Sequence, residues 1–178
     1  CKDGFKYPED CTDLSKLGHM ESGVYVVKPL LSNQSIVVFC DLEGGEGGWT
    51  VIFRKMDLSV PKKYLYKNSP SATSEYVNGT GQITEEFWMG LRPLYRLMKG
   101  EPHIMQVELE NLAEETRWAL YMDFRLTPIE NNSRMFLGDY YGTAGNGTRD
   151  AIGIELLTSE WIQPNVTKNA TNVNSAKQ

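Results

Sequence analysis

Residues 44–55 read GGEGGWTVIFRK, with four glycines in five positions followed by a tryptophan and an apolar run. A dinucleotide-binding fingerprint needs G-x-G-x-x-G at the start of a helix, but a strand-like segment follows here. A P-loop needs Gly-Lys-Ser/Thr, but Gly48 precedes Trp49. Glycine permits positive φ angles and a close approach of the backbone to a neighbouring surface. We therefore interpret the stretch as a turn leading into a packed strand over 49–53, in which Gly48 and Trp49 are structural.

The segments on either side of this turn alternate between strand and helix patterns. Short β-branched runs at 24–27 and 36–40 predict two strands before the turn. After it, residues 57–81 are polar and contain prolines and glycines, which predicts a long surface loop. Thr84 is expected to cap a short helix over 85–89 that carries Phe87 and Trp88.

A second helical segment follows, because Leu91, Leu94, Tyr95 and Met98 recur at helical spacing and form one apolar face. This spacing predicts that Trp88 and Tyr95 belong to the core rather than to a binding hot spot.

The clearest strand pattern lies further along the chain. Met105, Val107 and Leu109 alternate with polar residues, and a second run alternates from Trp118 to Leu126. This pattern predicts two half-buried antiparallel strands joined by residues 111–116. The apolar face of the second strand is expected to comprise Trp118, Leu120, Met122, Phe124 and Leu126. Residues 134–137 are a further candidate strand.

The composition is that of a globular protein of 178 residues, with 40% hydrophobic and 23% charged residues. The net charge of −5 and the absence of a Lys/Arg cluster argue against nucleic-acid partners. No stretch reaches the roughly 18 apolar residues of a membrane span, so we expect no membrane insertion. Because the chain opens with a cysteine followed by charged and aromatic residues, we expect a mature or excised fragment.

Six Asn-x-Ser/Thr sequons indicate the compartment, because this number exceeds what we expect by chance in a chain of this length. They predict a secreted, extracellular glycoprotein. The candidate glycosylation sites are Asn33, Asn78, Asn131, Asn146, Asn165 and Asn169.

The three cysteines, Cys1, Cys11 and Cys40, imply one disulfide and one leftover thiol. Their spacings match no zinc pattern, and neither histidine lies near a ligand cluster, so we predict no metal site. Spacing leaves all three pairings open.

Several motifs appear in the order found in fibrinogen C-terminal domains, and the chain resembles that family over roughly residues 10–148. The motifs are CTDL at 11–14, SGVY at 22–25, FCDLE at 39–43, GGWTVI at 47–52, EEFWMGL at 85–91 and GDYYGTAG at 138–145.

The resemblance implies that Cys11 and Cys40 form the family's first disulfide. Cys1 lies upstream of the matched region, where relatives connect to an oligomerising stalk. Two interpretations of Cys1 stay open: a bond between chains that supports an oligomer, or a consequence of excision.

The resemblance weakens toward the C-terminus. The family continues with a GMKFST-like strand, an acidic calcium loop, a second disulfide and a ligand pocket. Residues 153–158 could be the remnant of that strand, and Glu160 and Ile162 would then occupy calcium-ligand positions. An isoleucine side chain offers no oxygen, and Ca²⁺ needs six to eight oxygen ligands, so we expect no calcium cofactor.

The resemblance implies an α+β fold with a disulfide-linked N-terminal β subdomain. A central twisted antiparallel sheet with short helices follows, and the C-terminal lobe is truncated or degenerate. The expected organisation is an upstream linker at 1–9 and a fibrinogen C-terminal-like domain at 10–150. That domain divides into an N-terminal subdomain at 10–48 and a central subdomain at 49–150. A diverged, disordered tail is expected at 151–178.

Enzymatic activity is not expected, because neither His19 nor His103 belongs to a sequence-local nucleophile arrangement. The resemblance implies a lectin-like module that binds cell-surface or pathogen glycoconjugates in innate-immune recognition. The alternative is a receptor- or matrix-binding protein ligand, with a growth-factor-like or cell-adhesion role and no lectin activity. The expected partner is a glycan or a cell-surface protein.

Overall fold

The structure is a computed structural model that describes residues 7–30, 32–43, 47–56, 70–99, 101–149 and 152–156. It divides into two compact units, at 1–97 and 98–178. The first unit combines antiparallel strands with short helices, and the described part of the second is an antiparallel sheet with one 3-10 turn, so the predicted α+β class is confirmed. In the described part of the chain, no helix is long and apolar enough to cross a membrane.

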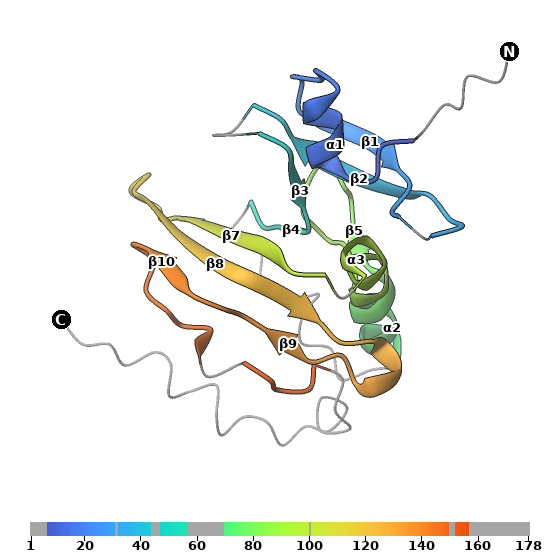
Figure 1. The fold of residues 1–178 in the computed structure, drawn as a ribbon. Helices are drawn as coiled ribbons and strands as arrows, with labels where there is room; N and C mark the ends of the chain where they lie inside the picture. Colours follow the sequence, from blue (N-terminus) through green and yellow to red (C-terminus); the bar gives the residue numbers. More distant parts are fainter. Residues whose placement is uncertain are drawn as a thin grey trace, which may run out of the picture. The chain divides into compact units, whose positions relative to one another are not determined.

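The first unit begins with α1 (Cys11–Lys16) and a three-stranded antiparallel sheet (Figure 1). The strands β1 (Gly23–Val27), β2 (Ile36–Asp41) and β3 (Trp49–Val51) lie in that order, which confirms the strands predicted at 24–27 and 36–40. The strand predicted over 49–53 is divided, because β3 ends at Val51 and Phe53 begins a strand of another sheet. The sequence analysis missed α1, which begins where the Asp10 carboxylate accepts a hydrogen bond from the Asp13 N–H at 2.8 Å.

The glycine turn has the structural role that the sequence predicts. Gly48 has a φ of +78°, and a Cβ at this position would lie 3.1 Å from the Thr12 Cα atom in α1. The Thr12 hydroxyl donates a hydrogen bond to the Gly48 carbonyl at 3.2 Å. The backbone of residue 48 therefore lies directly against α1, and Trp49 then starts β3. Gly44 and Gly45 lie outside the described residues.

Two predictions for the second part of this unit, the loop over 57–81 and the helix over 85–89, differ from the structure. The predicted loop over 57–81 includes a helix, α2 (Pro70–Asn78), followed by Gly79 with a φ of +99°; residues 57–69 lie outside the described part. Proline suits the start of a helix and glycine its end, which explains the position of α2.

The predicted helix over 85–89 is wrong. Phe87 and Trp88 form β6 (Phe87–Trp88), which pairs on one side with β4 (Phe53–Arg54) and on the other with β5 (Thr80–Gly81). Two flanking strands and the burial of Phe87 outweigh the local helical signal of Thr84.

The second helical segment is confirmed as α3 (Leu91–Met98), with Leu91, Leu94 and Met98 buried. The core of the first unit is formed by apolar side chains from each of its parts. Its buried members are Cys11, Leu14, Val27, Val38, Cys40, Leu42, Phe87, Met89, Leu91 and Leu94.

The second unit is built on a long antiparallel hairpin, as predicted. β7 (His103–Glu110) pairs with β8 (Thr116–Leu126), and β10 (Tyr140–Gly142) lies on the other side of β8 (Figure 1). A short strand, β9 (Met135–Phe136), pairs with the end of β8, which confirms the candidate strand at 134–137. A 3-10 turn over Ile129–Asn131 connects β8 with β9.

The predicted sidedness of β8 is wrong in its first half. Ala119 and Tyr121 are buried together with Phe124 and Leu126, whereas Trp118 is exposed. The register against β7 shifts by one residue between His103 and Met105, and Asp123, with a φ of +58°, lies in this irregularity. A β-bulge of this kind exchanges the two faces of a strand, so the alternation inverts at Asp123.

Candidate functional site

The inverted alternation of β8 places Trp118 on the solvent side of the sheet, and the neighbouring strand β10 adds a second exposed aromatic residue, Tyr141. In one row across the three strands, Gln106 pairs with Leu120, which pairs with Tyr141; in the next row, Glu108 pairs with Trp118. Trp118 is 44% exposed and Tyr141 is 54% exposed. We call the surface formed by Gln106, Glu108, Trp118, Leu120 and Tyr141 the aromatic face.

Backbone contacts fix the position of Trp118. Its N–H donates to the Thr143 hydroxyl at 3.3 Å, and its carbonyl accepts from the N–H groups of Thr143 at 2.8 Å and Ala144 at 3.0 Å. Gly142 allows β10 to approach this closely, because a Cβ there would lie 2.8 Å from the Ala119 Cα atom. The aromatic face therefore stands on a hydrogen-bonded sheet rather than on a mobile loop.

Polar groups border the aromatic rings. The Gln106 side-chain amide donates to the Glu108 carboxylate at 2.6 Å, which fixes both groups on the same face. An aromatic surface next to a carboxylate and an amide can pack against the C–H face of a sugar and hydrogen-bond its hydroxyls. It offers no nucleophile.

The two histidines lie in different units, His19 in the first and His103 in the second. His19 packs edge-on against Tyr25 with ring centroids 5.8 Å apart, and a His103 ring nitrogen lies 3.4 Å from the Met98 carbonyl. Among the described residues, no group of three or more His, Cys, Asp or Glu side chains could hold a metal ion. Glu160 and Ile162, the positions expected to replace the family's calcium ligands, lie outside the described residues.

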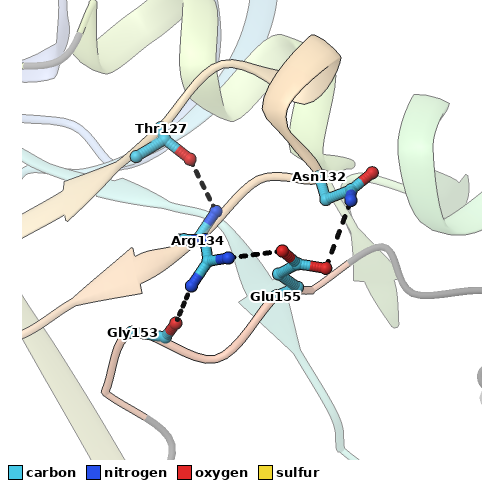
Figure 2. Close-up of polar contacts among 5 residues, drawn as sticks. All are labelled: Thr127, Asn132, Arg134, Gly153 and Glu155. Carbon is cyan, nitrogen blue, oxygen red and sulfur yellow. Dashed lines mark hydrogen bonds and ion pairs between the residues drawn. The ribbon is translucent and has the colours of Figure 1, made fainter.

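A polar cluster connects residues 152–156 to β9, as Figure 2 shows. The Arg134 guanidinium bonds the Glu155 carboxylate and donates to the Gly153 carbonyl at 3.1 Å, while Asn132 donates to Glu155 at 3.2 Å. The Arg134 N–H donates to the Thr127 hydroxyl at 2.7 Å. These partners satisfy the charges of Arg134 and Glu155, so the cluster has a structural role. We call Thr127, Asn132, Arg134, Gly153 and Glu155 the clasp.

The clasp changes where the predicted tail begins. Residues 152–156 fall within the range expected to be disordered, 151–178, yet Arg134 and Glu155 form a β-bridge. The rest of that range, from 157 onward, lies outside the described residues.

The first unit contains a hollow of about 300 Å³ beside α2 and β6. Its lining includes Asn78, Thr80, Trp88, Met89 and Pro93. The Trp88 ring stacks on Tyr76 with centroids 5.7 Å apart, and its N–H donates to the Tyr76 carbonyl at 2.8 Å. Trp88 is therefore held in one orientation.

The structure places the other predicted site residues as follows. Cys11 and Cys40 form a disulfide with Cα atoms 5.4 Å apart, which confirms that pairing; Cys1 lies outside the described residues. Asn33, Asn78, Asn131 and Asn146 are exposed, and Asn165 and Asn169 lie outside the described residues. Their glycosylation stays a prediction.

The aromatic face was not predicted from the sequence, because the alternation pattern places Trp118 on the buried side of β8. The one sequence signal of the inverted alternation in β8 was Asp123. A short acidic residue in the middle of an apolar strand is a candidate bulge, and a bulge moves the preceding residues to the opposite face.

Comparison with known proteins agrees with the fold. The family described as "Fibrinogen beta and gamma chains, C-terminal globular domain" matches residues 7–171. Angiopoietin-related protein 1 of Mus musculus is 32% identical over 164 residues, covering 92% of this chain and 32% of the relative. Techylectin-5A of Tachypleus tridentatus is 33% identical over 144 residues, covering 78% of this chain and 47% of the relative.

Among solved structures, the fibrinogen-like globe domain of human ANGPTL2 superposes with a TM-score of 0.75 at 33% identity. The match covers 83% of this chain and 65% of that one. The chain thus spans about a third of the length of the angiopoietin-related relative and about two thirds of the globe domain. The chain belongs to the fibrinogen C-terminal globular domain family, which is non-enzymatic.

Proposed function

We propose that this chain is an extracellular, non-enzymatic recognition domain that binds cell-surface or pathogen glycoconjugates through the aromatic face. The observation that carries the proposal is the exposure of Trp118 and Tyr141 on the hydrogen-bonded strands β8 and β10, beside the Glu108 carboxylate and the Gln106 amide of β7. Exposed aromatic residues on a protein surface are typical of binding sites.

Two further facts support the proposal. The family is typically secreted, and the name of one relative, techylectin-5A, identifies that relative as a lectin. The net charge of −5 does not favour a nucleic acid, and a sugar needs no cationic surface.

Retention on a column of immobilised N-acetylglucosamine tests the proposal. We expect the wild-type protein to be retained in the presence of a chelator, and Trp118→Ala to lose at least about tenfold in affinity, equivalent to about 1.4 kcal/mol. Phe136→Ala is the matched control, because Phe136 is 40% exposed in the same unit but outside the aromatic face.

The outcomes separate clearly. Equal retention of Trp118→Ala and wild type would exclude this face as the sugar site. Elution of the wild-type protein by chelator would contradict the expectation that binding needs no calcium.

A second candidate function, binding of a receptor or matrix protein, is favoured by the tip of the β7–β8 hairpin. Leu112 is 90% exposed there and lies between the acidic residues Glu110 and Glu114. The Asn111 side chain accepts from the N–H groups of Ala113 and Glu115, both at 2.9 Å, so the tip is preorganised. Capture of a cell-surface protein that depends on Leu112 but not on Trp118 would support this alternative.

A further inference from the structure

The hollow in the first unit lies next to a sequon. Asn78, Gly79 and Thr80 form an Asn-x-Thr triplet, and all three residues line the hollow together with Trp88, Met89 and Pro93. Trp88 and Pro93 are only half-buried, so part of this apolar lining is open to water, which is unfavourable unless something covers it.

Side chains of the adjacent strand cannot fill the hollow. Gly79 and Gly81 have φ angles of +99° and +90°, a backbone conformation that strongly favours glycine. A Cβ on Gly79 would lie 2.5 Å from the Met89 carbonyl oxygen, so the backbone of this segment is pressed against β6. Among the described residues, the two glycines therefore contribute no side chain to the hollow.

Asn78 is exposed at the last position of α2, at the edge of the hollow. Its Nδ2 group donates to the Ser74 carbonyl at 3.0 Å and to the Ser74 hydroxyl at 3.2 Å, and its Oδ1 atom accepts from Arg92 Nε at 3.3 Å. An N-glycosidic bond replaces one of the two Nδ2 protons. The remaining proton can keep the bond to the Ser74 carbonyl, and Oδ1 can keep its bond to Arg92.

Two other described sequons, at Asn131 and Asn146, lack this combination of access and proximity to the hollow. At Asn131, the third sequon residue is Ser133, which is 0% exposed and donates its hydroxyl to the Thr127 carbonyl at 3.2 Å. That hydroxyl is unavailable to a glycosylating enzyme in the folded protein. At Asn146, the next residue, Gly147, has no atom within 4 Å of its Cβ position, and Asn146 does not line the hollow.

We infer that Asn78 carries an N-linked glycan whose first N-acetylglucosamine covers the hollow and packs on Trp88 and Pro93. In the transfer step, Nδ2 bonds to C1 of the sugar of a lipid-diphosphate-linked oligosaccharide. The bond from C1 to the diphosphate oxygen breaks, the lipid diphosphate leaves, and one Nδ2 proton is released. The inference depends on the extracellular part of the proposed function, but not on the aromatic face.

The experiment uses the full chain secreted from mammalian cells that make only high-mannose glycans. Glycopeptide mass spectrometry measures the occupancy of each sequon. Endoglycosidase H then trims each glycan to a single N-acetylglucosamine, and thermal unfolding is measured before and after trimming.

We expect Asn78 to be occupied, and trimming to one sugar to leave the unfolding midpoint unchanged. Thr80→Ala, which removes the sequon, should lower the midpoint by several degrees, whereas Thr80→Ser, which keeps the sequon, should not. Asn33→Gln is the control for loss of a glycan from a turn. If Thr80→Ala is not secreted, peptide N-glycosidase is applied to the untrimmed wild-type protein instead. It releases whole glycans and converts each glycosylated asparagine to aspartate, and the unfolding midpoint of this product is compared with that of the endoglycosidase-trimmed protein.

An unoccupied Asn78 beside an occupied Asn33 or Asn146 would overturn the inference. It would also be overturned if Asn78 is occupied but Thr80→Ala unfolds at the wild-type midpoint. Sugar-column retention of the Thr80→Ala protein separates the two proposals, because the aromatic face lies in the other unit. If the wild-type protein fails to bind the sugar column while Asn78 is occupied and Thr80→Ala lowers the unfolding midpoint, the glycan ligand of the proposed function is refuted. The inference about Asn78 then stands.

Discussion

Removal of the Cys11–Cys40 disulfide should cost the first unit a large part of its stability. The bond joins α1 to β2, the two cysteines are 29 residues apart in sequence, and both are 0% exposed. For a loop of this length, the chain-entropy relation gives a loss of about 12 cal/mol/K, or about 3.6 kcal/mol at 25 °C. Small domains are stable by only about 5–15 kcal/mol in total.

The perturbation is the double variant Cys11→Ala, Cys40→Ala, and the assay is urea unfolding followed by tryptophan fluorescence. We expect the free energy of unfolding of the double variant to fall by about 3–4 kcal/mol. In the wild-type protein without reductant, an alkylating reagent should modify neither Cys11 nor Cys40. The single variant Cys11→Ala is the comparison that leaves Cys40 as a buried free thiol. A loss below about 1 kcal/mol, or free thiols at both positions, would refute the reasoning.

Three further predictions concern backbone, clasp and pH. Gly81→Ala should lower the free energy of unfolding by more than about 3 kcal/mol, because its Cβ would meet the backbone of β6. Gly145→Ala has a φ of +81° but no neighbour within 4 Å, so it should cost only about 1–2 kcal/mol. Thermal unfolding of the two variants compares these effects. Arg134→Gln should change global stability by less than about 1 kcal/mol, because Arg134 and Glu155 are partly exposed, but should speed hydrogen exchange at 153–156. Burial raises the pKa of Tyr76, so above pH 10 this side chain deprotonates in the unfolded chain before it does so in the folded protein. The wild-type protein should therefore lose stability above pH 10, and Tyr76→Phe should lose less over the same range. Urea unfolding at a series of pH values measures the difference.

Strong local patterns predicted much of the fold. The β-branched runs of β1 and β2 and the long alternating hairpin of β7 and β8 have periodicity over enough residues to identify strands. The apolar stripe of α3 did the same for a helix. The glycine turn was predicted because no phosphate motif fitted it, and the contact of Gly48 with α1 supplies the physical reason for its glycines.

The failures lie where tertiary pairing or a single residue decides the outcome. Phe87 and Trp88 read locally as helix but form the central strand of a three-stranded sheet. α1 has only six residues, too few for a clear period. The bulge at Asp123 exchanges the two faces of β8, so a strict two-residue period assigns Trp118 to the buried side. For this reason the aromatic face could not be predicted from periodicity.

The candidate site was accordingly only partly predictable. The disulfide followed from the resemblance, because spacing left three pairings open. Trp118 and Tyr141 are recognisable as a surface only after the register of β8 against β7 and β10 is known.

Hydrogen exchange with and without chitotriose, an N-acetylglucosamine trimer, tests the central claim most directly. If the aromatic face binds glycans, saturating chitotriose should slow exchange at the amides of β7, β8 and β10 around Gln106, Trp118 and Tyr141, and leave β1 and β2 unchanged. Unchanged exchange throughout β7, β8 and β10, or protection confined to the first unit, would contradict the account.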